Sequence, residues 1–190
     1  FRQIDHSVLL QHLSDWFGIS GSALSWFQSY LLSRFFFVTS CGLKSSSANL
    51  TCGVPQWSVL GQLLFIMYTT PLSLLISKSP VSHHLYADDT QLFISSPSHY
   101  NTNISHLQSV FNNVSSWMSA NRLSLNPSKT EFLIIGLPHQ LSKLNNPALS
   151  VGSNSTLLSV SNARNLGIII DSHISFYQHL SARIQSCNFH

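Results

Sequence analysis

The chain has 190 residues, enough for one hydrophobic core, and only 8% of them are charged, whereas soluble domains typically have about 25%. The net charge of +3 comes from nine scattered Lys and Arg residues and is too small to indicate a polyanion partner by itself. The three cysteines are odd in number and form no CxxC pair, which argues against a disulfide framework and favours a reducing compartment.

The first predicted elements are two helices. Apolar residues recur at helical spacing up to Phe17, and Gly18 follows as a C-terminal glycine. Ser20 or Ser22 can cap the second helix. The aromatic and β-branched run 35–39 favours a strand, and the segment 41–49 is predicted to be a loop.

The segment 45–77 has no charged residue, so it could be either a membrane-spanning helix or a buried helix. Val59–Ser77 approaches the ~20 residues that a spanning helix requires. Gln62 and Pro71 interrupt it, and no basic flank lies on one side only. We therefore expect a buried helix of a soluble domain here, after a short strand and a Gly-Pro turn.

The remaining elements alternate between strands and helices. We predict a hairpin over 85–94, an amphipathic helix over 104–118, and a strand after the turn at Asn126-Pro127. The segment 138–156 is predicted to be a loop, 157–171 to contain two strands, and the last residues to start a helix. This order predicts an α+β fold, with helices on one face of a mainly antiparallel sheet.

Asp88 and Asp89 are adjacent between two apolar runs, in a chain with only six carboxylates. Asp is favoured in solvated turns on conformational grounds alone. The alternative is a metal site, because two carboxylates on a hairpin can hold hard divalent cations for phosphoryl transfer. Such a site normally needs a third carboxylate from a neighbouring strand.

Several ordered motifs favour the second interpretation. "GVPQWSVLGQLL", "YADDTQLFI", "LSLNPSKTEFLIIG" and "ARNLGIIID" follow one another along the chain. Their order and spacing resemble the palm of reverse transcriptases from LINE-type, non-long-terminal-repeat retrotransposons. The resemblance runs from about Asp5 to the C-terminus. It implies a right-hand polymerase palm over 1–150, with a primer-grip hairpin and the start of the thumb over 151–190.

The resemblance also implies roles for individual residues, RNA template, DNA primer and deoxynucleoside triphosphates as partners, and Mg²⁺ or Mn²⁺ as cofactor. No membrane and no protein partner are expected, and without a visible signal peptide we expect a cytoplasmic and/or nuclear location. The implied catalytic residues are Asp88, Asp89 and Lys129, the two Asp residues being the metal ligands. The implied nucleotide- and template-binding residues are Gly53, Val54, Pro55 and Gln56, and the implied primer grip is Asn165, Leu166 and Gly167.

The sequence departs from the family pattern at two important positions. Aligning Ile4-Asp5-His6 with the family's "VDH" places Arg2 where the first catalytic Asp stands. Asp5 should not replace it, because residues three apart on a strand point to opposite faces, and it can instead cap the first helix. Trp57 stands where the family has a glycine that lets the backbone approach the base pair.

These departures predict an incomplete two-metal site and impaired catalysis. The chain begins at Phe1 without Met, and the fingers and most of the thumb are missing, so we expect a fragment. Residues 1–3 are either decayed element sequence or unrelated sequence joined to it. The alternatives to an impaired polymerase are a non-catalytic RNA- or DNA-binding remnant and a translated relic without function.

Other candidate sites are weaker. Arg34 can contact a nucleic-acid phosphate or be an ordinary solvated arginine, and both interpretations stay open. The aromatic run Phe35–Phe37 favours a core position over a base-stacking platform. His83 and His84 should face opposite ways on a strand and share no metal. Further potential zinc ligands lack a paired CxxC; they are His173, His179, Cys187 and His190.

Overall fold

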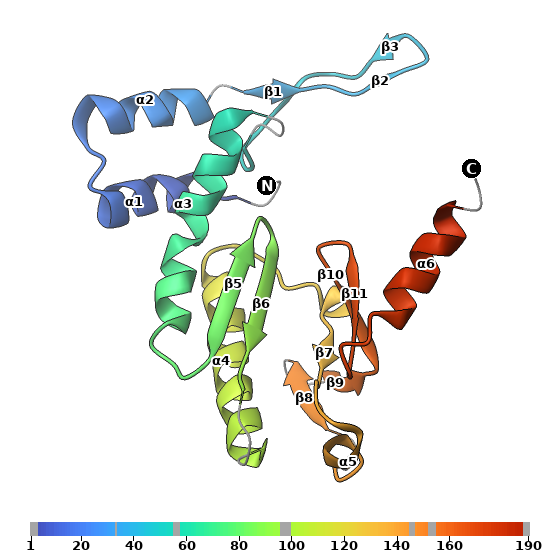
Figure 1. The fold of residues 1–190 in the computed structure, drawn as a ribbon. Helices are drawn as coiled ribbons and strands as arrows, with labels where there is room; N and C mark the ends of the chain where they lie inside the picture. Colours follow the sequence, from blue (N-terminus) through green and yellow to red (C-terminus); the bar gives the residue numbers. More distant parts are fainter. Residues whose placement is uncertain are drawn as a thin grey trace. The chain divides into compact units, whose positions relative to one another are not determined.

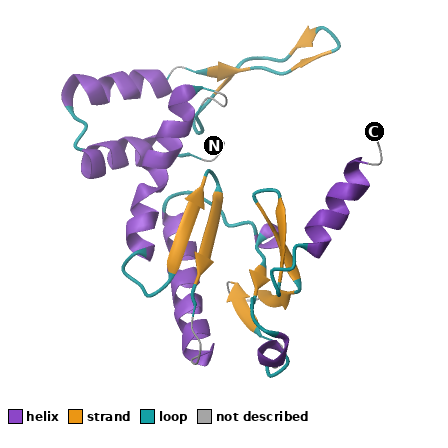
Figure 2. Ribbon diagram, viewed as in Figure 1, coloured by secondary structure: helices purple, strands orange, loops and turns teal. Residues whose placement is uncertain are grey.

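The computed structural model describes residues 4–32, 34–54, 58–95, 100–144, 147–151 and 155–187. The chain divides into two compact units, Phe1–Ser124 and Leu125–His190 (Figure 1). Both units contain helices and strands, so the predicted α+β class is confirmed (Figure 2). The division into residues 1–150 and 151–190 stays a prediction.

Local sequence signals set both ends of the first helix. Asp5 has extended backbone angles, and its side chain accepts hydrogen bonds from the amides of Ser7 and Val8 at 2.9 and 3.1 Å. Gly18 adopts the left-handed conformation at φ 64°, as the sequence predicts. The helices of this unit are α1 (His6–Phe17), α2 (Gly21–Leu31), α3 (Val59–Ile76) and α4 (Tyr100–Ala120).

The core of the first unit forms where α1, α2 and α3 meet. Its fully buried members include Leu9 and Leu13 on α1, Leu31 on α2, and Leu64 and Tyr68 on α3. Burying one such aliphatic side chain contributes about 1.5–3 kcal/mol. Helix packing around α3 is therefore the main source of stability in this unit.

Helix α3 is long and apolar enough to cross a membrane by length and composition. In the structure 39% of its 18 residues are buried inside the protein. They include Tyr68, whose backbone oxygen bonds the buried His12 ring at 3.1 Å. The helix therefore packs one side on the core, whereas a buried helix was expected: Val59, Leu63 and Ile66 are 90%, 47% and 58% exposed.

The strands of the first unit form three separate two-stranded sheets. Strands β1 (Phe35–Phe36) and β4 (Ala48–Asn49) pair antiparallel, as do β2 (Thr39–Ser40) and β3 (Leu43–Lys44). Every residue of these four strands is exposed. The core position predicted for Phe35–Phe37 is therefore wrong, because all three rings are at least half exposed among the residues that the structure describes. The third sheet pairs β5 (Ser82–Tyr86) with β6 (Asp89–Phe93).

The second unit contains one three-stranded sheet and one hairpin. The sheet has the order β7-β9-β8, with β7 and β9 parallel and β8 and β9 antiparallel. Its strands are β7 (Phe132–Leu133), β8 (Ala148–Val151) and β9 (Ser155–Val160), and the hairpin strands are β10 (Asn162–Asn165) and β11 (Ile168–Asp171). The remaining elements are the 3₁₀ helix η1 (Pro127–Lys129) and the helices α5 (Pro138–Leu141) and α6 (Tyr177–Cys187).

Three sequence-based expectations need correction here. The described strands form five small sheets, whereas one mainly antiparallel sheet was expected. The segment 41–49 contains β3 and β4, and the segment 138–156 contains α5 and β8, although both were expected to be loops. Strands of two to four residues carry too few apolar positions to be recognised by alternation, because their pairing comes from contacts distant in sequence.

We predict that Asp5→Ala destabilises the protein by about 1 kcal/mol, because α1 loses its N-cap. Hydrogen bonds from the Ser7 hydroxyl and then the Val8 amide hold the pKa of Asp5 below its ordinary value of 3.8. A lowered folded-state pKa means that the stabilisation is present above the unfolded pKa and is lost as the pH falls through the folded pKa. The free energies of unfolding in urea of the wild type and of Asp5→Ala should therefore become equal as the pH falls below about 4.

Ser20→Ala is the matched control, because Ser20 is the N-cap of α2 and makes no side-chain capping bond. We expect it to change stability much less than Asp5→Ala does. An equal loss in both variants at neutral pH would contradict the capping role of the Asp5 carboxylate.

Candidate functional site

The predicted hairpin around the paired carboxylates is present. Tyr86 pairs with Asp89, so the turn consists of Ala87 and Asp88, and Asp89 is the first residue of β6. Ala87 has φ 51°, the positive value that a type II′ turn has at this position and that usually favours glycine. Both carboxylates are exposed at this turn.

The hairpin offers the type of ligand that a divalent metal prefers, but too few ligands to hold one. Carboxylate oxygens are the ligands that Mg²⁺ prefers. Within the described residues, however, no group of three His, Cys, Asp or Glu side chains could hold a metal ion. Arg2, which stands where a third carboxylate is expected, lies outside the described residues. Asp88 and Asp89 could therefore supply two ligands of a larger set.

The histidines before the carboxylates have separate contacts. The His83 Nε2 atom lies 2.7 Å from the Ser73 hydroxyl on α3. The His84 ring packs edge-on against Phe93, with 5.1 Å between ring centroids. The two side chains thus serve the attachment and internal packing of the hairpin, and the prediction that they face opposite ways is confirmed.

The segment resembling the nucleotide-binding motif is fastened to the first residues of the chain. Asp5 forms an isolated antiparallel bridge with Cys52. The Gly53 amide donates to the Ile4 carbonyl at 2.7 Å, and the Gly53 carbonyl accepts from Nε2 of the buried His6, also at 2.7 Å. Gly53 has φ 86°, which a glycine adopts without strain.

The rest of this motif is described only in part. Val54 is buried in the core at 5% exposure. The positions of Pro55, Gln56 and the departure Trp57 lie outside the described residues. The structure therefore locates the entry to the motif and brings Gly53 beside Asp5 and His6.

In the second unit, a hairpin occupies the predicted primer-grip segment. Leu166 and Gly167 form its two-residue turn with φ values of 46° and 85°, the pattern of a type I′ turn. An Arg183 Nη atom on α6 donates to the Gly167 carbonyl at 3.2 Å. The Glu131 carboxylate accepts a hydrogen bond from the Arg164 amide at 3.0 Å, which links strand β10 to the segment before β7. The hairpin is thus held at its turn by α6 and on strand β10 by Glu131.

Lys129 ends the 3₁₀ helix η1, where its side chain is exposed. Asn126 caps this turn by accepting the Ser128 amide at 3.1 Å. Lys129 belongs to the second unit and the Asp88–Asp89 hairpin to the first. Their predicted cooperation in catalysis therefore stays a prediction.

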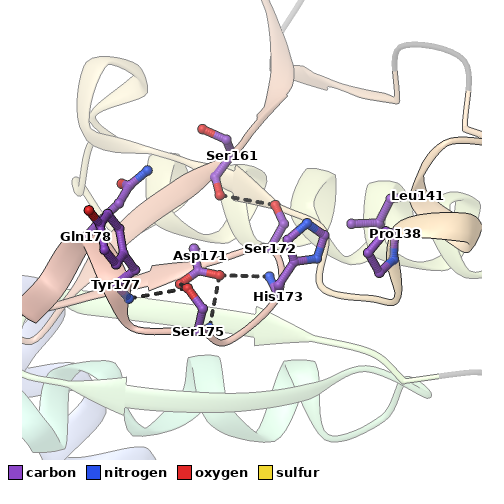
Figure 3. Close-up of a pocket in the computed structure, with 9 residues that line it drawn as sticks. All are labelled: Pro138, Leu141, Ser161, Asp171, Ser172, His173, Ser175, Tyr177 and Gln178. Carbon is purple, nitrogen blue, oxygen red and sulfur yellow. Dashed lines mark hydrogen bonds between the residues drawn. The ribbon is translucent and has the colours of Figure 1, made fainter.

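Asp171 is the most extensively bonded carboxylate, and we did not single it out from the sequence. Its two oxygens accept the amides of His173 and Ser175 and the Ser175 hydroxyl at 2.9–3.1 Å (Figure 3). They also accept the Phe176 amide at 2.9 Å. These bonds, the Ser175 amide first, lower the pKa of Asp171 to about 2. An Asp followed by Ser four residues later, just before a helix, was the available sequence signal.

A pocket of about 450 Å³ lies beside this carboxylate. It is lined by residues from α5, from the end of β11 and from the start of α6, including Leu141, His173 and Tyr177 (Figure 3). His173 Nδ1 lies 3.1 Å from the Gly136 carbonyl, so this ring also holds the loop together. Because the carboxylate already accepts four hydrogen bonds, we assign Asp171 to shaping the loop that leads into α6.

We predict that His6→Ala destabilises the protein by about 1–3 kcal/mol, because it leaves the buried Gly53 carbonyl without its donor. Hydrogen exchange of the Gly53 amide, which bonds Ile4, should accelerate as the junction loosens. The exposed His106 on α4 provides the control, since His106→Ala removes an imidazole without a buried bond. Unchanged Gly53 exchange in His6→Ala would rule out the fastening role.

We also predict that Asp171→Asn accelerates amide exchange most at Phe176, because an NH₂ group that cannot accept its hydrogen bond replaces one carboxylate oxygen, while the other oxygen still accepts the amides of His173 and Ser175. The folded pKa of about 2 lies below the ordinary 3.8, so the stabilisation is present above about pH 4 and is lost as the pH falls to 2. The difference in unfolding free energy between the wild type and Asp171→Asn should disappear over that pH range. Asp15→Asn, an exposed change on α1, should have no such effect.

Comparisons with known proteins identify the same family that the ordered motifs resemble. A family model described as reverse transcriptase (RNA-dependent DNA polymerase) matches residues 1–170. The probable RNA-directed DNA polymerase from transposon BS of Drosophila melanogaster is 30% identical over 171 residues. This alignment covers 84% of the present chain and 18% of the relative, so the chain spans a small part of the relative's length. The match over most of its length shows that the chain belongs to the reverse transcriptase (RNA-dependent DNA polymerase) family.

Proposed function

We propose that the chain is the palm region of a LINE-type reverse transcriptase, which binds an RNA template paired to a DNA primer but extends that primer poorly or not at all. The observation that carries the proposal is the β5–β6 hairpin, which exposes Asp88 and Asp89 at its turn in a chain of this family. In a palm, paired carboxylates at such a turn are expected to bind Mg²⁺ or Mn²⁺.

The remaining roles follow from the same resemblance. We assign nucleotide and template contacts to Gly53–Gln56, an approach to the triphosphate to Lys129, and the primer grip to Asn165–Gly167. The exposed position of Lys129 and the two bonds that anchor the β10–β11 hairpin are compatible with these assignments. When bound, divalent ions would supply charge neutralisation at the phosphates, while the protein positions the reacting groups.

Two substitutions support the proposed loss of polymerase activity. Arg2 places a cation where the family has a metal-binding Asp. Unit charges about 4 Å apart interact with on the order of 4 kcal/mol at a surface-like dielectric, and here an attraction would become a repulsion. Trp57 would place an indole where a glycine lets the backbone approach the base pair.

Asp5 does not compensate for the missing carboxylate. Its side chain accepts the amides of Ser7 and Val8 and the Ser7 hydroxyl, and these bonds favour its role as helix cap. Turning it toward a metal would cost α1 its N-cap, about 1 kcal/mol. The proposed metal site therefore has two carboxylates, Asp88 and Asp89, and lacks the first Asp, which the family has at the position of Arg2.

We predict that the purified chain binds a labelled RNA–DNA hybrid in a salt-dependent manner and incorporates no nucleotide above background with Mg²⁺. Fluorescence anisotropy measures binding, and primer extension measures incorporation. Extension of the primer at ordinary Mg²⁺ would refute the impairment, and absence of hybrid binding at low salt would refute the palm assignment.

Variants of the proposed metal ligands test the role of the hairpin directly. Asp88→Asn with Asp89→Asn should weaken Mn²⁺ binding measured by electron paramagnetic resonance, because it removes both carboxylates, whereas Arg2→Asp should strengthen it. Asp15→Asn is the control, since it removes an exposed carboxylate of α1. Equal weakening by the control and the hairpin variant would remove Asp88 and Asp89 as ligands.

A further inference from the structure

The segment 34–50 forms an antiparallel ribbon that is exposed along its length. Its pairing extends from the Leu50 amide, which donates to the Arg34 carbonyl at 2.8 Å, through β1–β4 and β2–β3. Cys41 and Gly42 close it in a two-residue turn with φ values of 50° and 78°. Figure 1 shows the ribbon continuing from the end of α2.

The ribbon exposes an unusual amount of aromatic surface. Phe35, Phe36 and Phe37 are 63%, 50% and 52% exposed, and successive residues of a strand face opposite sides. An isolated two-stranded ribbon is marginally stable in water, because neither face is covered by a core. These rings are therefore available to stack on planar groups of a partner.

Helix α2, which precedes the ribbon in the chain, carries a second group of planar side chains. The rings of Trp26 and Tyr30 are stacked, with 5.6 Å between centroids and 14° between planes. The Arg34 guanidinium lies over the Tyr30 ring, 4.3 Å from its centroid. Its Nε donates to the Tyr30 carbonyl at 2.6 Å and uses one of the five guanidinium N–H groups.

A second cation on an aromatic ring lies within the ribbon. The Lys44 ammonium is 4.8 Å from the Phe37 ring centroid. No Asp or Glu occurs between Asp15 and Asp88, so no acidic residue in this part of the sequence opposes a polyanion. Aromatic rings combined with cations, and without carboxylates, are the groups that bind single-stranded nucleic acid: bases stack on the rings and phosphates meet the cations.

We propose that Trp26, Tyr30, Arg34, Phe37 and Lys44, which we call the aromatic–cation strip, form a binding surface for single-stranded RNA or DNA. The strip is separate from the Asp88–Asp89 hairpin and does not require a hybrid or a metal. The proposal therefore does not rest on the proposed palm function. Base stacking predicts tolerance of sequence, and two cations predict a modest salt dependence.

The test measures anisotropy of a labelled single-stranded oligonucleotide with the full 190-residue chain, using oligouridine, oligothymidine and a DNA duplex. We expect both single strands to bind and the duplex to bind more weakly, since its bases are already stacked. Trp26→Ala should weaken single-strand binding about tenfold. Arg34→Ala or Lys44→Ala should each reduce the slope of log K against log salt by about 0.7.

Matched controls exist for both kinds of residue. Trp16 on α1 is 51% exposed, close to the 53% of Trp26, and Lys78 is an exposed lysine outside the ribbon. Trp16→Ala and Lys78→Ala should leave single-strand affinity unchanged. Trp26→Phe should retain most of the affinity, because it keeps an aromatic face, and thermal melting of every variant verifies folding.

Three outcomes would overturn the proposal. They are equal affinity for duplex and single strands, equal losses in the Trp26 and Trp16 variants, and dimerisation that depends on Trp26 while oligonucleotide affinity does not. The last would identify a second copy of the chain as the occupant. Loss of hybrid binding with retained single-strand binding would refute the palm assignment alone.

Discussion

The first unit depends on one junction, in which residues 4–6 are fastened to residues 52–54. Ile4 is fully buried in the core, and its carbonyl accepts the Gly53 amide. Asp5 bridges Cys52 and caps α1, while His6 donates to the Gly53 carbonyl. Three consecutive residues therefore anchor the core, begin a helix and hold the entry to the segment that resembles a nucleotide-binding motif. A change at any of them acts on both segments.

The few carboxylates divide into two groups by what they bind. Asp5, Glu131 and Asp171 accept backbone amides, and each holds an element end or a hairpin strand in place. Asp88 and Asp89 are exposed at a turn instead. Because bonded carboxylates are costly to redirect, the exposed pair is available to a ligand, and among the described residues the only other exposed carboxylate without such bonds is the single Asp15 on α1. This contrast gives the hairpin its chemical interest within a reverse transcriptase family member.

Two kinds of nucleic-acid contact would then act in one small chain. The palm residues are expected to hold a template–primer hybrid through its backbone and its terminal base pair. The aromatic–cation strip offers stacking surfaces that a paired strand cannot use, because its bases already stack on one another. Loss of catalysis at Arg2 and Trp57 would affect the first contact and leave the second intact.

The sequence by itself determined the helices with clear caps, the Asp88–Asp89 hairpin, the family and, through the family resemblance, a second hairpin within 151–190. These depend on local signals: a capping Asp5, a left-handed Gly18, apolar periodicity and ordered motifs. Only the tertiary structure decided that His6 holds Gly53, that Asp171 accepts four hydrogen bonds, and that Phe35–Phe37 are exposed. An aromatic run has the same composition on a ribbon as in a core, and only the presence or absence of a covering layer separates the two.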